Sequence, residues 1–163
     1  VGTYPLPTPQ LDRFLFKISM DHIDREAELE VLDSIKERKR LLGNQNKVNR
    51  DDILKARETI FTQINIDQAI NTTLVDISTN LRKDERVLQG NSTRSMVLLL
   101  PALQVRAAIR GRSYVSSEDI ENLLPEVLNH RIELVPGVSD FNKVLHDNME
   151  RPLEELAKST LTK

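Results

Sequence analysis

Residues 92–128 read STRSMVLLLPALQVRAAIRGRSYVSSEDIENLLPEVL, and this stretch indicates two consecutive helices. Ser92 precedes the first helix, which is apolar on most faces, as expected at the centre of a bundle. Pro101 within it removes one backbone donor and predicts a kink. Ser116 and Asp119 form a capping box ahead of the second apolar run, so we expect another helix to begin there.

Similar helix-start signals occur earlier in the chain. Asp24 can cap a helix that ends before Gly43, and Asn49 is followed three residues later by Asp52. A weaker capping box begins at Asn65. Apolar residues then recur at spacings of three and four: Ile66, Ala69, Ile70, Leu74, Ile77 and Leu81. This spacing predicts a helix with one buried face.

Two short segments are predicted to be extended. Residues 14–20, FLFKISM, alternate apolar and other side chains, which is the pattern of a half-buried strand. A lone strand leaves its backbone groups unpaired, so we expect its sheet to lie upstream of Val1. Residues 130–134, HRIEL, are the second candidate. The expected fold is mainly α: a helical bundle preceded by one edge strand left over from an α/β domain.

Composition excludes several classes of function. The chain has 163 residues, with 23 Lys and Arg against 25 Asp and Glu, no Cys and no Trp. This balance gives no electrostatic footprint for nucleic acid or an anionic membrane. The absence of Cys excludes disulfides and zinc–thiolate sites and fits a reducing cytoplasm. The longest apolar run, residues 96–103, is far shorter than the ~20 residues that span a bilayer, so no membrane insertion is expected.

The sequence shows no independent active site. Three histidines have neither metal-ligand spacing nor an acid–His–nucleophile arrangement: His22, His130 and His146. The carboxylates lie on helix faces without a paired-carboxylate signature. Arg106, Arg110 and Arg112 form a basic cluster of the kind that usually lies at a solvated helix end. No metal site is expected.

Two segments resemble a known family. Residues 2–14, GTYPLPTPQLDRF, resemble the GTYPLPEAQLDRF stretch of the MoxR family of AAA+ ATPases. Residues 90–95, GNSTRS, followed by an apolar helix and RGRSYVSSEDI, resemble that family's sensor-2 segment. The similarity extends from residue 2 to about residue 136, in the family's order. Thr8 and Pro9 replace the usual Glu-Ala, and the chain contains neither a GxxxxGK(S/T) loop nor an acidic Walker B strand.

The resemblance implies three structural parts. Residues 1–20 would be the C-terminal edge of an AAA+ α/β core, with the arginine-finger segment and the last strand. Residues 21–136 would form a helical lid domain that carries sensor 2. Residues 137–163 would form a C-terminal helical extension.

The resemblance also implies roles for three residues. Arg13 would be the arginine finger, which reaches the nucleotide of a neighbouring subunit and neutralises charge on the transferred phosphoryl group. Arg94 would be sensor 2 and would contact the ATP phosphate of its own subunit from the first turn of its helix. Gly90 would allow the chain to turn tightly into that helix.

The implied whole protein is a chaperone-like ATPase of the bacterial cytoplasm. It would form a homo-oligomeric, hexameric ring, use ATP and Mg²⁺, and work with proteins that contain von Willebrand A domains. The chain alone would bind neither ATP nor Mg²⁺ and would be inactive, because the Walker motifs are absent from it. Two alternatives remain open: a magnesium-chelatase-like AAA+ motor subunit, and a helical adaptor that binds no nucleotide.

Overall fold

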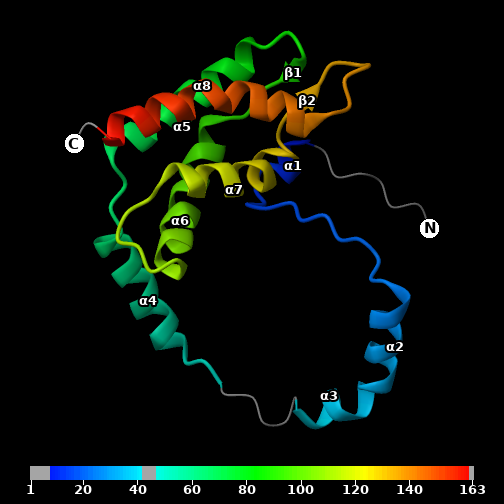
Figure 1. The fold of residues 1–163 in the computed structure, drawn as a ribbon. Coiled ribbons are helices and arrows are strands. Elements are labelled where there is room, and N and C mark those ends of the chain that lie inside the picture. Colours follow the sequence, from blue (N-terminus) through cyan, green and yellow to red (C-terminus); the bar gives the residue numbers. More distant parts are fainter. Residues whose placement is uncertain (1–7, 42–46, 162–163) are drawn as a thin grey trace. The chain divides into compact units, whose positions relative to one another are not determined.

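The computed structural model describes residues 8–41 and 47–161 (Figure 1). The chain divides into two compact units. Unit 1 contains the described residues up to Lys17 and those from Thr59 onward, and unit 2 contains residues 18–58. Helices predominate in the described residues, which confirms the expected fold class.

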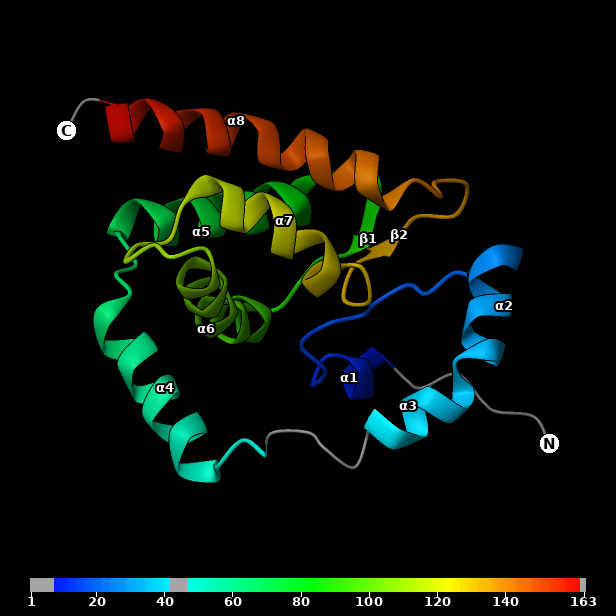
Figure 2. The same cartoon turned by 60° about the horizontal axis from the view of Figure 1, so that its bottom comes forward.

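Unit 1 is organised around four helices: α5 (Gln68–Lys83), α6 (Thr93–Ile109), α7 (Ser117–Leu128) and α8 (Phe141–Leu161). Helix α8 packs against α5 and α7, and α7 packs against α6 (Figure 2). The apolar faces of these helices meet in one core, to which they contribute Leu81, Leu103, Leu124 and Leu145. The core therefore includes α8, whereas the domain boundaries at residues 20 and 136 stay predictions.

A small antiparallel sheet pairs the segment that follows α5 with the segment that follows α7. Strand β1 (Val87–Gln89) pairs with β2 (Glu133–Leu134), which confirms an extended segment within residues 130–134. Arg86, just before β1, lies 2.7 Å from the carboxylates of both Asp84 and Asp147. The pair with Asp84 links the start of β1 to the C-terminal end of α5, and the pair with Asp147 links it to α8.

Most of the predicted helix caps are present. Ser92 and Ser116 are the N-caps of α6 and α7. The Asp119 carboxylate accepts the Ser116 N–H at 2.9 Å, as a capping box requires. Asp24 accepts the Ala27 N–H at 2.8 Å at the start of α2 (Arg25–Asp33).

One predicted cap is wrong. Helix α5 is capped by Asp67, whose Oδ1 accepts the Ala69 N–H at 2.8 Å. Asn65 instead forms a β-bridge with Tyr114. Its N–H donates to Ser113 O at 2.8 Å and its carbonyl accepts the Val115 N–H at 3.0 Å. Its backbone is thus committed to a bridge two residues before the helix begins.

Unit 2 contains α2, α3 (Ile35–Leu41) and the first part of α4 (Arg50–Gln63). The single helix predicted after Asp24 is interrupted at Ser34, whose hydroxyl donates to Val31 O at 3.3 Å. Its predicted end at Gly43 lies outside the described residues. Asn49 caps α4, with its Oδ1 accepting the Asp51 N–H at 3.2 Å. None of the residues of α2 and α4 is buried.

The strand predicted at residues 14–20 does not form in the described structure. No strand lies beside it there, so its backbone groups find other partners. The Lys17 N–H donates to Glu126 O of α7 at 3.0 Å, and side chains after α7 take up the carbonyls of Phe14 and Leu15. Among the described helices, none has the length and apolar composition needed to cross a membrane.

Candidate functional site

Arg13 lies in a turn that follows the short helix α1 (Thr8–Leu11). The Phe14 N–H closes this turn by donating to Leu11 O at 3.0 Å. The Arg13 side chain is exposed, and its guanidinium carbon lies 5.2 Å from the centre of the Phe14 ring. The turn therefore presents a permanent positive charge to solvent, where an external anion can reach it.

The residues on both sides of Arg13 are bound by Arg131, which follows α7. Arg131 Nε donates to Asp12 Oδ1 at 3.1 Å, and Nη2 donates to the Asp12 carbonyl at 3.0 Å. Nη1 donates to the Leu15 carbonyl at 3.0 Å. The Arg131 side chain is only 1% exposed. A single buried guanidinium thus holds the turn from within.

The other two donors of Arg131 are also used. Nη2 donates to the Phe14 carbonyl, and Nη1 donates to the Val127 carbonyl in the last turn of α7. A guanidinium has five N–H donors, so every one of them has an acceptor. The turn is thereby tied to the C-terminal end of α7.

His130 contributes a further contact to the same turn. Its Nε2 lies 2.8 Å from the Phe14 carbonyl, so this nitrogen carries the proton and donates. Nδ1 is buried and has no hydrogen-bond partner among the described residues. Burial lowers the pKa of His130, an effect that the Phe14 carbonyl partly opposes and that the Arg131 charge reinforces. The imidazole is therefore neutral near pH 7.

Asp12 also joins the turn to the N-terminus of α6. Ser95 Oγ donates at 3.4 Å to Asp12 Oδ1, the oxygen that accepts from Arg131. Ser95 is fully buried, and its N–H is 3.4 Å from the hydroxyl of the N-cap, Ser92. The turn is consequently attached to both α6 and α7.

Arg94 lies in the first turn of α6, as predicted, and its side chain is exposed. Asp12 contacts Ser95, and these two residues are the sequence neighbours of Arg13 and Arg94. A positive side chain is unfavourable at a helix N-terminus unless an anion binds there. An anion at the N-terminus of α6 would be stabilised by the Arg94 guanidinium and by the helix dipole.

The structure shows a close approach of α5 at Gly90, whereas the expected part of this glycine in the turn into α6 stays a prediction. Gly90 is not in the left-handed region, whereas Gly111 and Gly137 are. A Cβ at residue 90 would lie 2.8 Å from Arg82 Cγ and 3.4 Å from Arg82 Cα. Glycine is therefore needed here because α5 passes close to this part of the chain.

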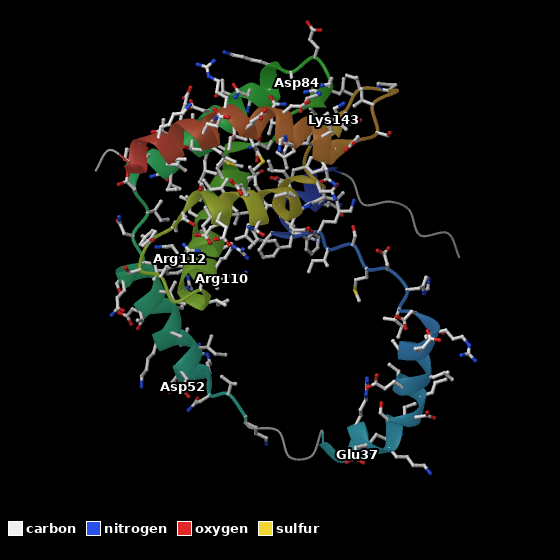
Figure 3. All side chains as sticks on the ribbon, viewed as in Figure 1. Glu37, Asp52, Asp84, Arg110, Arg112 and Lys143 are labelled. Atoms are coloured by element: carbon white, nitrogen blue, oxygen red, sulfur yellow. The ribbon has the colours of Figure 1, made fainter. Side chains whose placement is uncertain are left out.

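Two members of the basic cluster are not solvated as predicted. Arg112 donates to both oxygens of Asp119, at 2.8 and 2.7 Å, and Arg106 Nε lies 3.3 Å from Asp119 Oδ1. The Asp119 side chain is inaccessible to solvent. Arg110 is exposed, and it comes with Arg112 from the connection between α6 and α7 (Figure 3). Arg106 and Arg112 together neutralise the buried carboxylate of Asp119, which is a structural role.

The exposed guanidinium groups of Arg13 and Arg94 can each pair with an anion. In the part of the chain that the structure describes, no group of three or more His, Asp or Glu side chains could hold a metal ion. Arg13 and Arg94 suit the outer oxygens of a phosphate chain. Sequence reasoning missed Asp12, His130 and Arg131. The available signal was a His-Arg pair directly after a predicted helix, ahead of the apolar Ile132.

Known proteins resemble the chain over most of its length. The family model for the AAA lid domain matches residues 79–151. The chain is 37% identical over 137 residues to the uncharacterized protein YeaC of Bacillus subtilis (strain 168), an alignment that covers 83% of this chain and 42% of YeaC. It is 31% identical over 144 residues to Chaperone MoxR1 of Mycobacterium tuberculosis, covering 82% of this chain and 37% of that protein.

A solved structure has the same fold. It is that of a protein of Cytophaga hutchinsonii with a provisional assignment as an ATPase, with a TM-score of 0.76 and 27% identity over 92% of this chain and 49% of that chain. The chain thus spans only 42% and 37% of the two curated relatives. Since MoxR1 is 31% identical over 82% of the chain and the AAA lid model matches within the same region, the chain belongs to the MoxR family of AAA+ proteins.

Proposed function

We propose that the chain is the lid-bearing part of a MoxR-type ATPase, in which Arg13 and Arg94 act on ATP where two subunits of a homo-oligomeric ring meet. The observation that supports this most strongly is the contact between Asp12 and Ser95, beside which both arginines are exposed. One relative of the chain is named a chaperone, which supports a chaperone-like use of the energy of hydrolysis.

Catalysis of phosphoryl transfer depends mainly on positive charge placed near the transferred phosphoryl group, and not on a covalent bond to the protein. Negative charge spreads over the oxygens of the transferred group, and a planar guanidinium can neutralise two of them at once. ATP with Mg²⁺ supplies the phosphoryl group and its leaving group when it is bound. This chain's part is to bring Arg13 and Arg94 to the phosphate chain, while the phosphate loop and the magnesium ligands belong to an α/β domain outside these 163 residues.

Both arginines are proposed to serve the same nucleotide. The family resemblance placed Arg94 on the nucleotide of its own subunit and Arg13 on that of a neighbour. The Asp12–Ser95 contact favours a shared target, because it brings the chain beside Arg13 against the chain beside Arg94. If the finger reaches across the interface, Arg94 then reaches across it as well.

Mixed rings of the full-length protein test this arrangement. Arg13→Ala is expected to lower kcat by about 10³-fold, as for other arginine fingers. Subunits carrying Arg94→Ala with an intact phosphate loop are then mixed with subunits that lack the phosphate-loop Lys. If Arg94 acts across the interface, the mixture contains complete sites and hydrolyses ATP faster than either variant alone. No recovery would assign Arg94 to its own subunit.

The remaining features of the proposed function follow from the family. They are a hexameric ring, a von Willebrand A-domain partner and a place in the bacterial cytoplasm. A full-length protein that neither binds nor hydrolyses ATP would contradict the ATPase and leave the helical adaptor. Chelation of magnesium into a porphyrin by the full-length protein would favour the magnesium-chelatase alternative.

A further inference from the structure

The buried guanidinium of Arg131 lies at the centre of the turn that carries Arg13, and it binds backbone rather than side chains for the most part. Four of its five N–H donors go to carbonyl oxygens, and three of those belong to Asp12, Phe14 and Leu15. These three residues flank Arg13 on both sides. We propose that Arg131 is a positioning residue that fixes Arg13 for catalysis, an inference that rests on the function proposed above.

Stability alone does not explain a charge at this place. Removing a guanidinium from water is costly, and a buried ion pair can often be replaced by apolar side chains without loss of stability. What an apolar side chain cannot do is hold several carbonyls in one geometry. The donors of Arg131 form a rigid planar fork, whereas Lys has three donors on one freely rotating nitrogen. The presence of Arg at residue 131 therefore indicates that its function is to hold the carbonyl groups of the turn in fixed positions.

The turn needs such an anchor because it lies outside regular structure. Residues 12–17 belong to no helix or strand, so no ladder of backbone hydrogen bonds holds them. Arg131 replaces that ladder, and the imidazole of His130 adds one more donor to the Phe14 carbonyl. A reacting group that is displaced by about 1 Å can lose ~10²-fold in rate, so a loosely held finger would be a poor one.

The anchor also joins the finger to the helices of the lid. Arg131 binds the Val127 carbonyl of α7, and Asp12 binds Ser95 of α6, next to Arg94. Any displacement of α6 and α7 as a body is then transmitted to the turn that carries Arg13. Arg131 thus makes the position of Arg13 depend on the lid.

The test uses the full-length protein with Arg131→Lys, Arg13→Ala and the double variant. Arg131→Lys is expected to lower kcat by about 10²-fold and to leave KM for ATP within about twofold. In the Arg13→Ala background the same substitution should lower kcat no further, because its effect passes through Arg13. Arg151→Lys is the matched control, since Arg151 is exposed and bonded only within α8 to Glu155 among the contacts described; its kcat should be unchanged.

Asp12→Asn provides a second route, because it removes the carboxylate that neutralises Arg131 but keeps an oxygen acceptor. It decides the question if Arg131→Lys does not fold. An unchanged kcat for the variant that folds, or losses that multiply with that of Arg13→Ala, would overturn the positioning role. An unchanged kcat for Arg13→Ala itself is a different result: it would refute the proposed finger, and the inference with it.

Discussion

The Asp119 carboxylate lies 2.7 Å from the Arg112 guanidinium and is inaccessible to solvent. It accepts a second bond from Arg112 at 2.8 Å and the Ser116 N–H at 2.9 Å. The Asp119 carboxylate therefore caps the N-terminus of α7 and also binds Arg112 in the loop that connects α6 to α7. That connection sets how α6, which carries Arg94, is held against α7, which the Arg13 turn contacts.

Replacing Asp119 by Asn is predicted to destabilise the fold by about 3 kcal/mol. The substitution leaves Arg112 without its negative partner and leaves Arg106 with only the exposed carboxylate of Glu118, 3.6 Å from its Nη2, among the ion pairs described. The cost is at the lower end for a broken buried pair, because the two arginine side chains are still 20% and 19% exposed. Urea unfolding followed by circular dichroism measures it. Glu155→Gln, in an exposed pair on α8, is the control and should change stability by less than about 0.5 kcal/mol.

Replacing Gly90 by Ala is predicted to destabilise the fold by about 1–3 kcal/mol through overpacking. The new methyl group would collide with Arg82 Cγ, and Arg82 could move only by giving up the bond from its Nε to Asn91 O at 3.2 Å. In an Arg82→Ala background the same substitution should cost clearly less. An equal cost in both backgrounds would mean that backbone conformation, and not contact with Arg82, requires the glycine.

The helices were predictable because their signals are local. Ser92, Ser116 and the period of the apolar residues on α5 lie next to the elements that they define. Arg94 was likewise placed correctly, in the first turn of α6. The resemblance singled out Arg13, but the turn around it could not be predicted, because its partner Arg131 is more than a hundred residues away in sequence.

The predicted strand failed for a related reason. The alternation in residues 14–20 did not identify the side chains that pack, because Phe14, Phe16 and Ile18 are exposed whereas Leu15 packs against the core. It also does not report what satisfies the backbone. Here Arg131 and His130 satisfy the carbonyls of Phe14 and Leu15, and nothing near those residues in sequence indicates it. The same holds for Asp119, whose capping role was predicted, whereas its pairing with Arg112 depended on the path of the loop between two helices.

The free energy of unfolding is predicted to decrease below about pH 4. Hydrogen bonds from Arg86 hold the pKa of Asp84 well below its usual value, although burial acts in the opposite direction. A carboxyl group with a lowered pKa in the fold contributes stability above its unfolded pKa of about 3.9, and this contribution is lost as the pH falls toward the folded pKa. Unfolding in urea at pH 6, 4 and 3 measures the decrease. Asp84→Asn should be less stable at pH 6 but should show a shallower decrease, and parallel curves would refute the assignment to Asp84.

His130 is predicted to add a separate pH dependence between about pH 7 and pH 5. Burial lowers the pKa of its imidazole in the fold, so the unfolded chain, with a His pKa of about 6.5, binds the proton more readily. Stability is therefore full above pH 6.5 and falls as the pH decreases toward the folded pKa. Gln at residue 130 can still donate to the Phe14 carbonyl but cannot titrate. His130→Gln should consequently lose less stability than the unchanged chain between pH 7 and pH 5, whereas His22→Gln, at an exposed position, should behave like the unchanged chain. Equal losses in both variants would show that burial does not hold the pKa of His130 below its value in the unfolded chain.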